Sequence, residues 1–163
     1  MELNDYPVRI CVAGSRSWHD RRMFDIILRE YLSWAGVGPY AFISGVAWRG
    51  PDRMIIDWAS ENNVPCFEFE ADWDQFGKAA GHIRNGVMRK HLTHLLVFWD
   101  GESRGTKEMI ENTMKLENAH VFVVFLEPDR DWIERQRRKA LANAQFSTKR
   151  FRAKHHGWKQ TGC

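Results

Sequence analysis

Five short apolar runs recur along this chain, and segments with helical spacing separate them. The runs cover residues 8–13, 40–44, 64–69, 94–99 and 120–126. After the first run, apolar residues three and four positions apart define one face of a helix. These residues are Phe24, Ile27, Leu28, Tyr31 and Leu32. Apolar strands that alternate with amphipathic helices are typical of α/β proteins. The sequence therefore predicts a three-layer, Rossmann-like α/β domain with a mainly parallel sheet of about five strands.

Charge divides the chain into two parts. Residues 128–163 contain ten Lys or Arg against three Asp or Glu, a net charge of +7, whereas residues 1–127 carry a net charge of −4. We expect the Rossmann-like domain to span 1–127. We expect a basic C-terminal extension at 128–163, helical to about residue 144 and then irregular. Such a charge run is typical of a solvated tail. The alternative is nucleic-acid contact, with Phe146, Phe151 and Trp158 available for stacking between the basic residues.

Several classes of protein are excluded by composition. No apolar stretch approaches the roughly 18 residues of a membrane span, and no secretory signal pattern is present. We therefore expect a cytoplasmic protein with no membrane partner. The three Cys residues lack paired spacing, and His82, His91 and His94 lack the spacing of a zinc site. We expect neither a metal nor a cofactor.

Four polar loops follow the first four apolar runs. They read GSRSWHD (14–20), SGVAWRGPD (44–52), ADWDQFGKAAGHIRN (71–85) and DGESRGT (100–106). Ligands bind beyond the carboxyl ends of strands in open parallel sheets, and glycine turns let backbone N–H groups approach an anion. One such loop could be a simple turn. Four loops that together contain Arg16, Arg49, Arg84 and Arg104 indicate a single polyanion site.

These loops carry a family resemblance. The motifs AGSRSW, SGVAWRGPDRMIIDWA, ADWDQFGKAAGHIRNGVM and FWDGESRGTKEMI resemble the SLOG superfamily of Rossmann-like domains, specifically its YspA/YpsA-related branch, over residues 9–126. The resemblance implies binding of a nucleotide or an ADP-ribose-like ligand between the first and fourth strands, by a sensor or sequestering protein. It also implies a homo-oligomer.

Two alternatives come from other members of the superfamily. Lonely Guy phosphoribohydrolases cleave the N-glycosidic bond of nucleoside monophosphates, and proteins of the DNA-processing protein A type bind single-stranded DNA. The chain could accordingly be an N-glycosidic hydrolase of a nucleotide, or a protein that binds single-stranded nucleic acid through its basic tail.

The same motifs imply ligand-binding residues in each loop. They are Gly14, Ser15 and Arg16 in the first loop, Gly45, Arg49, Gly50 and Asp52 in the second, Asp72, Trp73, Lys78, Gly81 and Asn85 in the third, and Asp100, Gly101, Ser103, Gly105 and Thr106 in the fourth. Val46 stands where the family has a second glycine. Trp73 either stacks on a base or covers the core, and Asp100 either contacts a ribose hydroxyl or caps its turn.

A hydrolase would use Arg84 and Glu108 as its catalytic residues. Arg84 fits the arginine of the phosphoribohydrolase signature, and the motif favours a phosphate-binding or catalytic role over an ordinary helix-surface charge, since Arg suits bidentate phosphate contacts. The signature glutamate corresponds to Met109, one residue after Glu108. One residue along a helix rotates a side chain by about 100°. Glu108 therefore needs a different helix start to reach the same atom.

Overall fold

The computed structural model describes residues 1–35 and 38–125. The strands are β1 (Val8–Gly14), β2 (Tyr40–Ser44), β3 (Cys66–Glu68), β4 (His94–Trp99) and β5 (His120–Phe125). The helices are α1 (Arg21–Trp34), α2 (Pro51–Glu61), α3 (Trp73–Phe76), α4 (Ala80–His91) and α5 (Arg104–Thr113), with short 3-10 helices at Leu3–Asp5 and Gly77–Ala79. The basic extension predicted for residues 128–163 lies outside the described residues.

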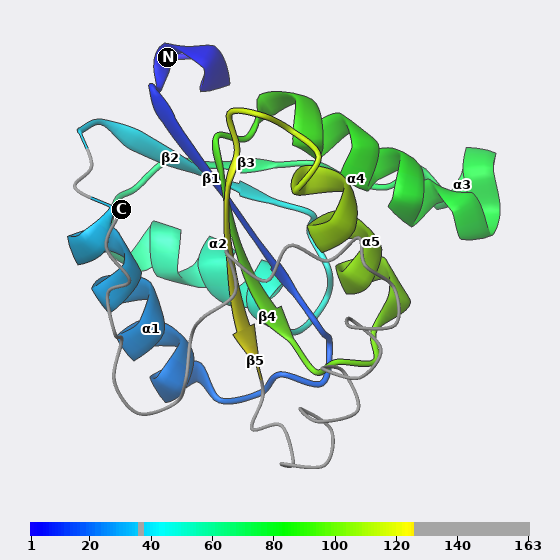
Figure 1. Cartoon of the computed structure of the whole chain (residues 1–163), viewed down its shortest axis with the longest axis horizontal. Helices are drawn as coiled ribbons and strands as arrows, with labels where there is room; N and C mark the ends of the chain where they lie inside the picture. Colours follow the sequence, from blue (N-terminus) through cyan, green and yellow to red (C-terminus); the bar gives the residue numbers. More distant parts are fainter. Residues whose placement is uncertain (36–37, 126–163) are drawn as a thin grey trace.

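All five strands are parallel and form one sheet in the order β3-β2-β1-β4-β5 (Figure 1). This confirms the predicted fold class. The chain leaves the central strand β1 toward β2 and later returns on its other side as β4. The loops after β1 and β4 consequently lead to helices on opposite faces of the sheet, which is the arrangement that opens a ligand crevice in doubly wound sheets.

Two apolar layers hold the helices against the sheet. Helices α1 and α2 cover one face, where Phe24, Leu28 and Ile55 are buried against Phe42 and Phe98. Helices α4 and α5 cover the other face. Successive strand side chains point to opposite faces of the sheet, and the apolar residues of α4 and α5 pack on those that point to this second face. The sheet is therefore buried on both sides, as its continuously apolar strands require.

The third strand is shorter than the sequence predicts. Its predicted range was 64–69, whereas β3 covers Cys66–Glu68. Pro65 has no N–H group to donate to a neighbouring strand, although its carbonyl accepts a hydrogen bond of 2.8 Å from the Phe42 amide. β3 is thus a short edge strand. Among the helices of the described residues, none combines the length and apolar character needed to cross a membrane.

Candidate functional site

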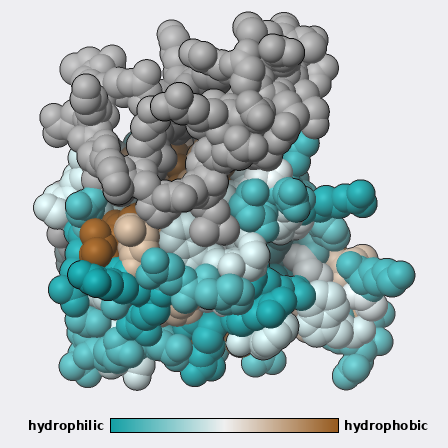
Figure 2. Space-filling model, turned by 90° about the horizontal axis from the view of Figure 1, so that it is seen from below, coloured by the Kyte–Doolittle hydropathy of each residue, from teal (hydrophilic) through white to brown (hydrophobic). Residues whose placement is uncertain are grey.

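A cavity of about 440 Å³ lies at the carboxyl edge of the sheet and is lined by residues from all four polar loops. Figure 2 views the molecule from this side, where the described residues present a largely hydrophilic surface. Twelve predicted site residues line the cavity: Gly14, Arg16, Asp52, Trp73, Lys78, Gly81, Arg84, Asn85, Asp100, Ser103, Gly105 and Thr106. Loops that are distant in sequence therefore meet in one place.

Other predicted residues do not line the cavity. The backbone of Gly50 at the start of α2 and of Gly101 in the fourth loop has φ of 81° and 82°, a region that favours glycine. Asp72 caps α3, because its carboxylate accepts a hydrogen bond of 2.8 Å from the Gln75 amide. The Arg49 guanidinium lies 4.3 Å from the ring centroid of Trp48. These residues shape the loops or the outer surface.

The first and fourth loops are joined by hydrogen bonds. The buried Ser15 hydroxyl accepts a hydrogen bond of 3.0 Å from the Asp100 amide, and the Ser17 hydroxyl donates to the Asp100 carboxylate at 2.7 Å. That carboxylate also accepts from the amides of Glu102 and Ser103, so it caps the turn. Burial alone would raise the pKa of Asp100, but these hydrogen bonds outweigh burial and lower the pKa. The ionised Asp100 therefore links the first loop to the fourth.

The amino end of α5 faces the cavity without a side-chain cap. Ser103 is the N-cap residue, yet its hydroxyl does not bind the helix amides and instead accepts a hydrogen bond of 2.9 Å from Thr106. Within the described part of the chain, the amides of Arg104, Gly105 and Thr106 have no acceptor. By contrast, Asp20 caps α1 through the Met23 amide. Free helix amides at a cavity are suited to binding an anion.

The second loop holds a buried carboxylate beside an arginine. Asp52, in the first turn of α2, is 6% exposed, and backbone amides of Gly14 and Gly45 donate to its carboxylate. The Arg84 guanidinium donates to the Gly45 carbonyl and lies near Asp52. Burial raises the pKa of Asp52, and the nearby Arg84 and the backbone hydrogen bonds only partly oppose this. The cavity wall thus carries the positive guanidinium of Arg84 beside the carboxyl group of Asp52, whose pKa is raised.

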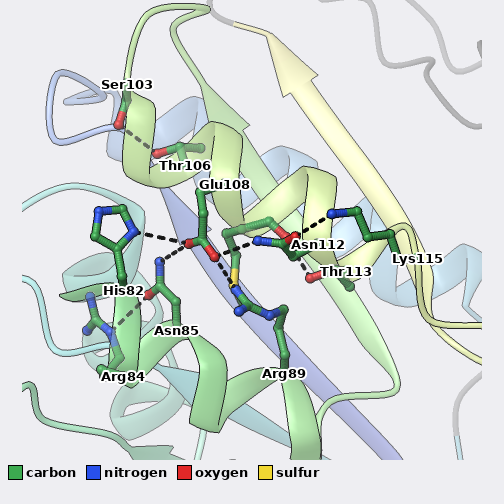
Figure 3. Close-up of polar contacts among 11 residues, drawn as sticks. His82, Arg84, Asn85, Arg89, Ser103, Thr106, Glu108, Asn112, Thr113 and Lys115 are labelled. Atoms are coloured by element: carbon green, nitrogen blue, oxygen red, sulfur yellow. Dashed lines mark hydrogen bonds and ion pairs between the residues drawn. The ribbon is translucent and has the colours of Figure 1, made fainter. Parts of the chain in front are cut away.

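The structure places Glu108 away from the cavity lining. Figure 3 shows its carboxylate between Asn85 and Arg89 on α4 and Asn112 on α5. Burial would raise the pKa of Glu108, but the hydrogen bonds from Asn112 and Asn85 and the charge of Arg89 lower it. Met109 lines the cavity instead. The structure therefore agrees with the sequence: Met109, and not Glu108, occupies the position on α5 that lines the cavity.

Five lining residues were not among the predicted site residues: Ala13, Ser17, Ala47, His82 and Met109. A helical period could have found His82, because residues 81, 82 and 85 share one face of α4. The remaining four lie within two positions of predicted residues in the sequence. Among the described residues, no three His, Cys, Asp or Glu side chains gather closely enough to hold a metal ion.

Two comparisons find known proteins that are similar to this chain. Residues 8–76 match the model of a family described as YAcAr: YspA, cpYpsA-related SLOG family. The Gene 61 protein of Mycobacterium phage D29 is 31% identical over 113 residues, which cover 66% of this chain and 89% of that protein. No solved structure matches the chain significantly.

Proposed function

This chain belongs to the YspA, cpYpsA-related SLOG family, and we propose that it binds a nucleotide or nucleotide-derived molecule, such as ADP-ribose, in the cavity at the carboxyl edge of the sheet. Its role is that of a sensor or sequestering protein. The proposal rests on the amino end of α5, which has no side-chain cap and lines the same cavity as Arg16 and the exposed Trp73.

The phosphate end of the ligand lies at the amino end of α5. Free amides at Gly105 and Thr106 and the guanidinium of Arg16 supply donors, and the positive end of the helix dipole favours an anion there. Apart from its chain neighbours and the backbone of its own helix, Gly105 has no heavy atom within 4 Å of the place that a Cβ would occupy. A phosphate oxygen can therefore approach the backbone closely at that residue.

The base end of the ligand lies against Trp73. This side chain is 53% exposed and lines the cavity from the third loop. A Cβ at Gly81 would lie 3.5 Å from the Trp73 ring, an ordinary van der Waals contact, so the ring lies close to the first turn of α4. Stacking of a base on an aromatic ring is worth about 1–3 kcal/mol. The cavity volume also falls within the range of small-molecule sites.

Glycosidic cleavage receives no support from the carboxylates. Asp100 is held by its turn and by Ser17, Asp52 is buried beside Arg84, and Glu108 does not line the cavity. A hydrolase needs a carboxylate that reaches the scissile bond. We therefore propose binding without turnover. Nucleic-acid contact through residues 128–163, and a homo-oligomer, stay predictions.

Isothermal titration calorimetry of the full chain tests the proposal. The ligands are AMP, ADP-ribose and NAD⁺, with adenosine and ribose 5-phosphate to separate the contributions of phosphate and base. We expect binding of at least one phosphorylated nucleoside and much weaker binding of adenosine. If none of the phosphorylated compounds binds, or adenosine binds equally well, the proposal is wrong.

Two tryptophan variants identify the base end. We expect Trp73→Leu to weaken nucleotide binding about tenfold, as expected for the loss of a stacked base, while ribose 5-phosphate binding changes little. Trp34→Leu is the matched control, because Trp34 is 51% exposed and lies at the end of α1, outside the cavity lining. Equal effects of both substitutions would contradict stacking at Trp73.

A further inference from the structure

Glu108 lies outside the cavity, yet hydrogen bonds connect it through Asn85 to Arg84 on the cavity wall (Figure 3). We propose that Glu108 is a positioning residue: it fixes the amide of Asn85, and this amide fixes the guanidinium plane of Arg84. We call this series of hydrogen bonds from Glu108 through Asn85 to Arg84 the relay. Its effect on ligand binding rests on the proposed function, whereas the relay itself does not depend on that function.

The first step is the orientation of the Asn85 amide. Asn85 is 9% exposed, and its Oδ1 accepts a hydrogen bond of 3.0 Å from Arg84 Nε. Its Nδ2 donates at 3.2 Å to Oε2 of Glu108. An amide offers an acceptor at one end and donors at the other, whereas an ionised carboxylate only accepts. Glu108 therefore selects the orientation in which the Asn85 oxygen faces Arg84.

The second step is the anchoring of Glu108. Its two carboxylate oxygens have separate partners. Oε1 accepts hydrogen bonds of 2.7 Å from Arg89 and 2.7 Å from Asn112, while Oε2 faces Asn85 and lies 3.6 Å from Nδ1 of His82. These contacts connect α4 to α5. They also keep Oε2 directed at Asn85.

The third step is the arginine itself. Arg84 donates through Nε to Asn85 and through Nη1 to the Gly45 carbonyl, so two sides of the planar fork are held by protein. The rest of the fork is then oriented before an anion arrives. Preorganisation of this kind strengthens binding because less conformational freedom is lost. Arg84, Asn85 and Glu108 thus connect the second loop to α4 and α5.

A substitution at Glu108 separates positioning from simple packing. In Glu108→Gln, the Gln oxygen can keep Arg89 and Asn112, but its NH₂ group then faces the NH₂ group of Asn85. Asn85 must flip, which turns its own NH₂ group toward Arg84 Nε and breaks that hydrogen bond. Adding Asn85→Asp supplies an acceptor at both ends. The double variant should therefore restore the bond to Arg84.

The first readout needs no ligand. The hydrogen exchange rate of the Arg84 Nε–H is followed by NMR in the full chain, with its signal assigned from its absence in Arg84→Lys. We expect slow exchange in the wild type, faster exchange in Glu108→Gln, and slow exchange again in the Asn85→Asp/Glu108→Gln double variant. Asn112→Ala is the control, because it removes a partner of Oε1 and leaves the Asn85 contact of Oε2 in place.

The second readout is ADP-ribose affinity. We expect Glu108→Gln to weaken binding about tenfold, in line with the loss of one hydrogen bond to a charged group, and the double variant to recover most of it. Unchanged Arg84 exchange in Glu108→Gln, or no recovery in the double variant, would overturn the relay. If the relay behaves as expected and the wild type does not bind ADP-ribose, the relay stands and that ligand assignment fails.

Discussion

The guanidinium group of Arg84 occupies the space that a side chain at position 45 would need, and it donates a hydrogen bond to the Gly45 carbonyl. Oδ1 of Asp52 lies 2.9 Å from the same place. The missing Cβ at residue 45 therefore lets an arginine from α4 reach the loop after β2. This contact joins two of the four loops around the cavity.

Gly45→Ala should destabilise the fold by about 1–3 kcal/mol, because the new methyl group overlaps Arg84 and presses on Asp52. Arg84→Ala vacates part of that space, so the two substitutions should be less than additive when combined. Urea denaturation of both single variants and the double variant measures the coupling. Gly86→Ala is the control partner, since a Cβ there lies 3.6 Å from Arg89 Nη2 and away from Gly45. Additive effects for Gly45 and Arg84 would show that the contact carries no energy.

Gly105→Ala should abolish anion binding while leaving the fold intact. The methyl group would enter open space in the first turn of α5, and alanine favours a helix over glycine by about 1 kcal/mol. It would nevertheless block the approach of a phosphate oxygen to the free amides. Calorimetry with the nucleotide panel and thermal unfolding test the two effects separately. Gly86→Ala makes the same exchange inside α4, outside the cavity lining, and should keep full affinity.

Much of this architecture follows from local patterns. Phe24, Ile27 and Leu28 show the helix face that packs on the sheet, and they are buried as their spacing predicts. Because the strands are parallel, polar loops after them must meet at one edge, so the convergence of Gly14 and Asp100 on one cavity also follows from the sequence.

Side-chain direction at the ends of elements does not follow from these patterns. The rotation of α5 depends on where the helix begins, at Arg104 after Ser103, and this decides that Met109 rather than Glu108 lines the cavity. Arg49 shows the same limit, because its stacking on Trp48 depends on the path of one loop. Such choices are set by tertiary contacts of single residues rather than by a repeating pattern.

Val46 is a valine in a backbone conformation that favours glycine. Its φ is 55°, and a β-branched residue with positive φ is strained by about 1–2 kcal/mol. Val46→Gly relieves this strain but increases the freedom of the unfolded chain, which offsets part of the gain. We expect a net stabilisation of about 1 kcal/mol, seen as a higher urea midpoint.

Asn63 provides the control for Val46. Its φ is 54°, yet asparagine tolerates the left-handed region far better than valine does. Asn63→Gly should therefore leave stability unchanged or slightly lower. If Val46→Gly fails to stabilise the protein more than Asn63→Gly does, the strain at residue 46 is relieved by its surroundings, and the prediction is wrong.

His94 makes stability depend on pH at the opposite end of the sheet. Its ring stacks on His120 with centroids 4.8 Å apart, and burial together with the neighbouring His120 lowers the pKa of His94 to about 4. An unfolded histidine titrates near 6.5. Between these two values the unfolded chain binds more protons at this residue, so the stability contribution of neutral His94 is lost as pH falls from about 6.5 toward 4.

Replacing His94 with phenylalanine keeps an aromatic ring beside His120 but removes the titrating group. The melting temperature of His94→Phe should therefore fall less than that of the wild type between pH 7 and pH 4.5, measured by circular dichroism in low salt. Carboxylates also titrate in this range, so the informative quantity is the difference between the two proteins. His19→Gln, at an exposed histidine in the first loop, should follow the wild-type curve. Parallel curves for wild type and His94→Phe would mean that protonation of His94 does not contribute to acid destabilisation.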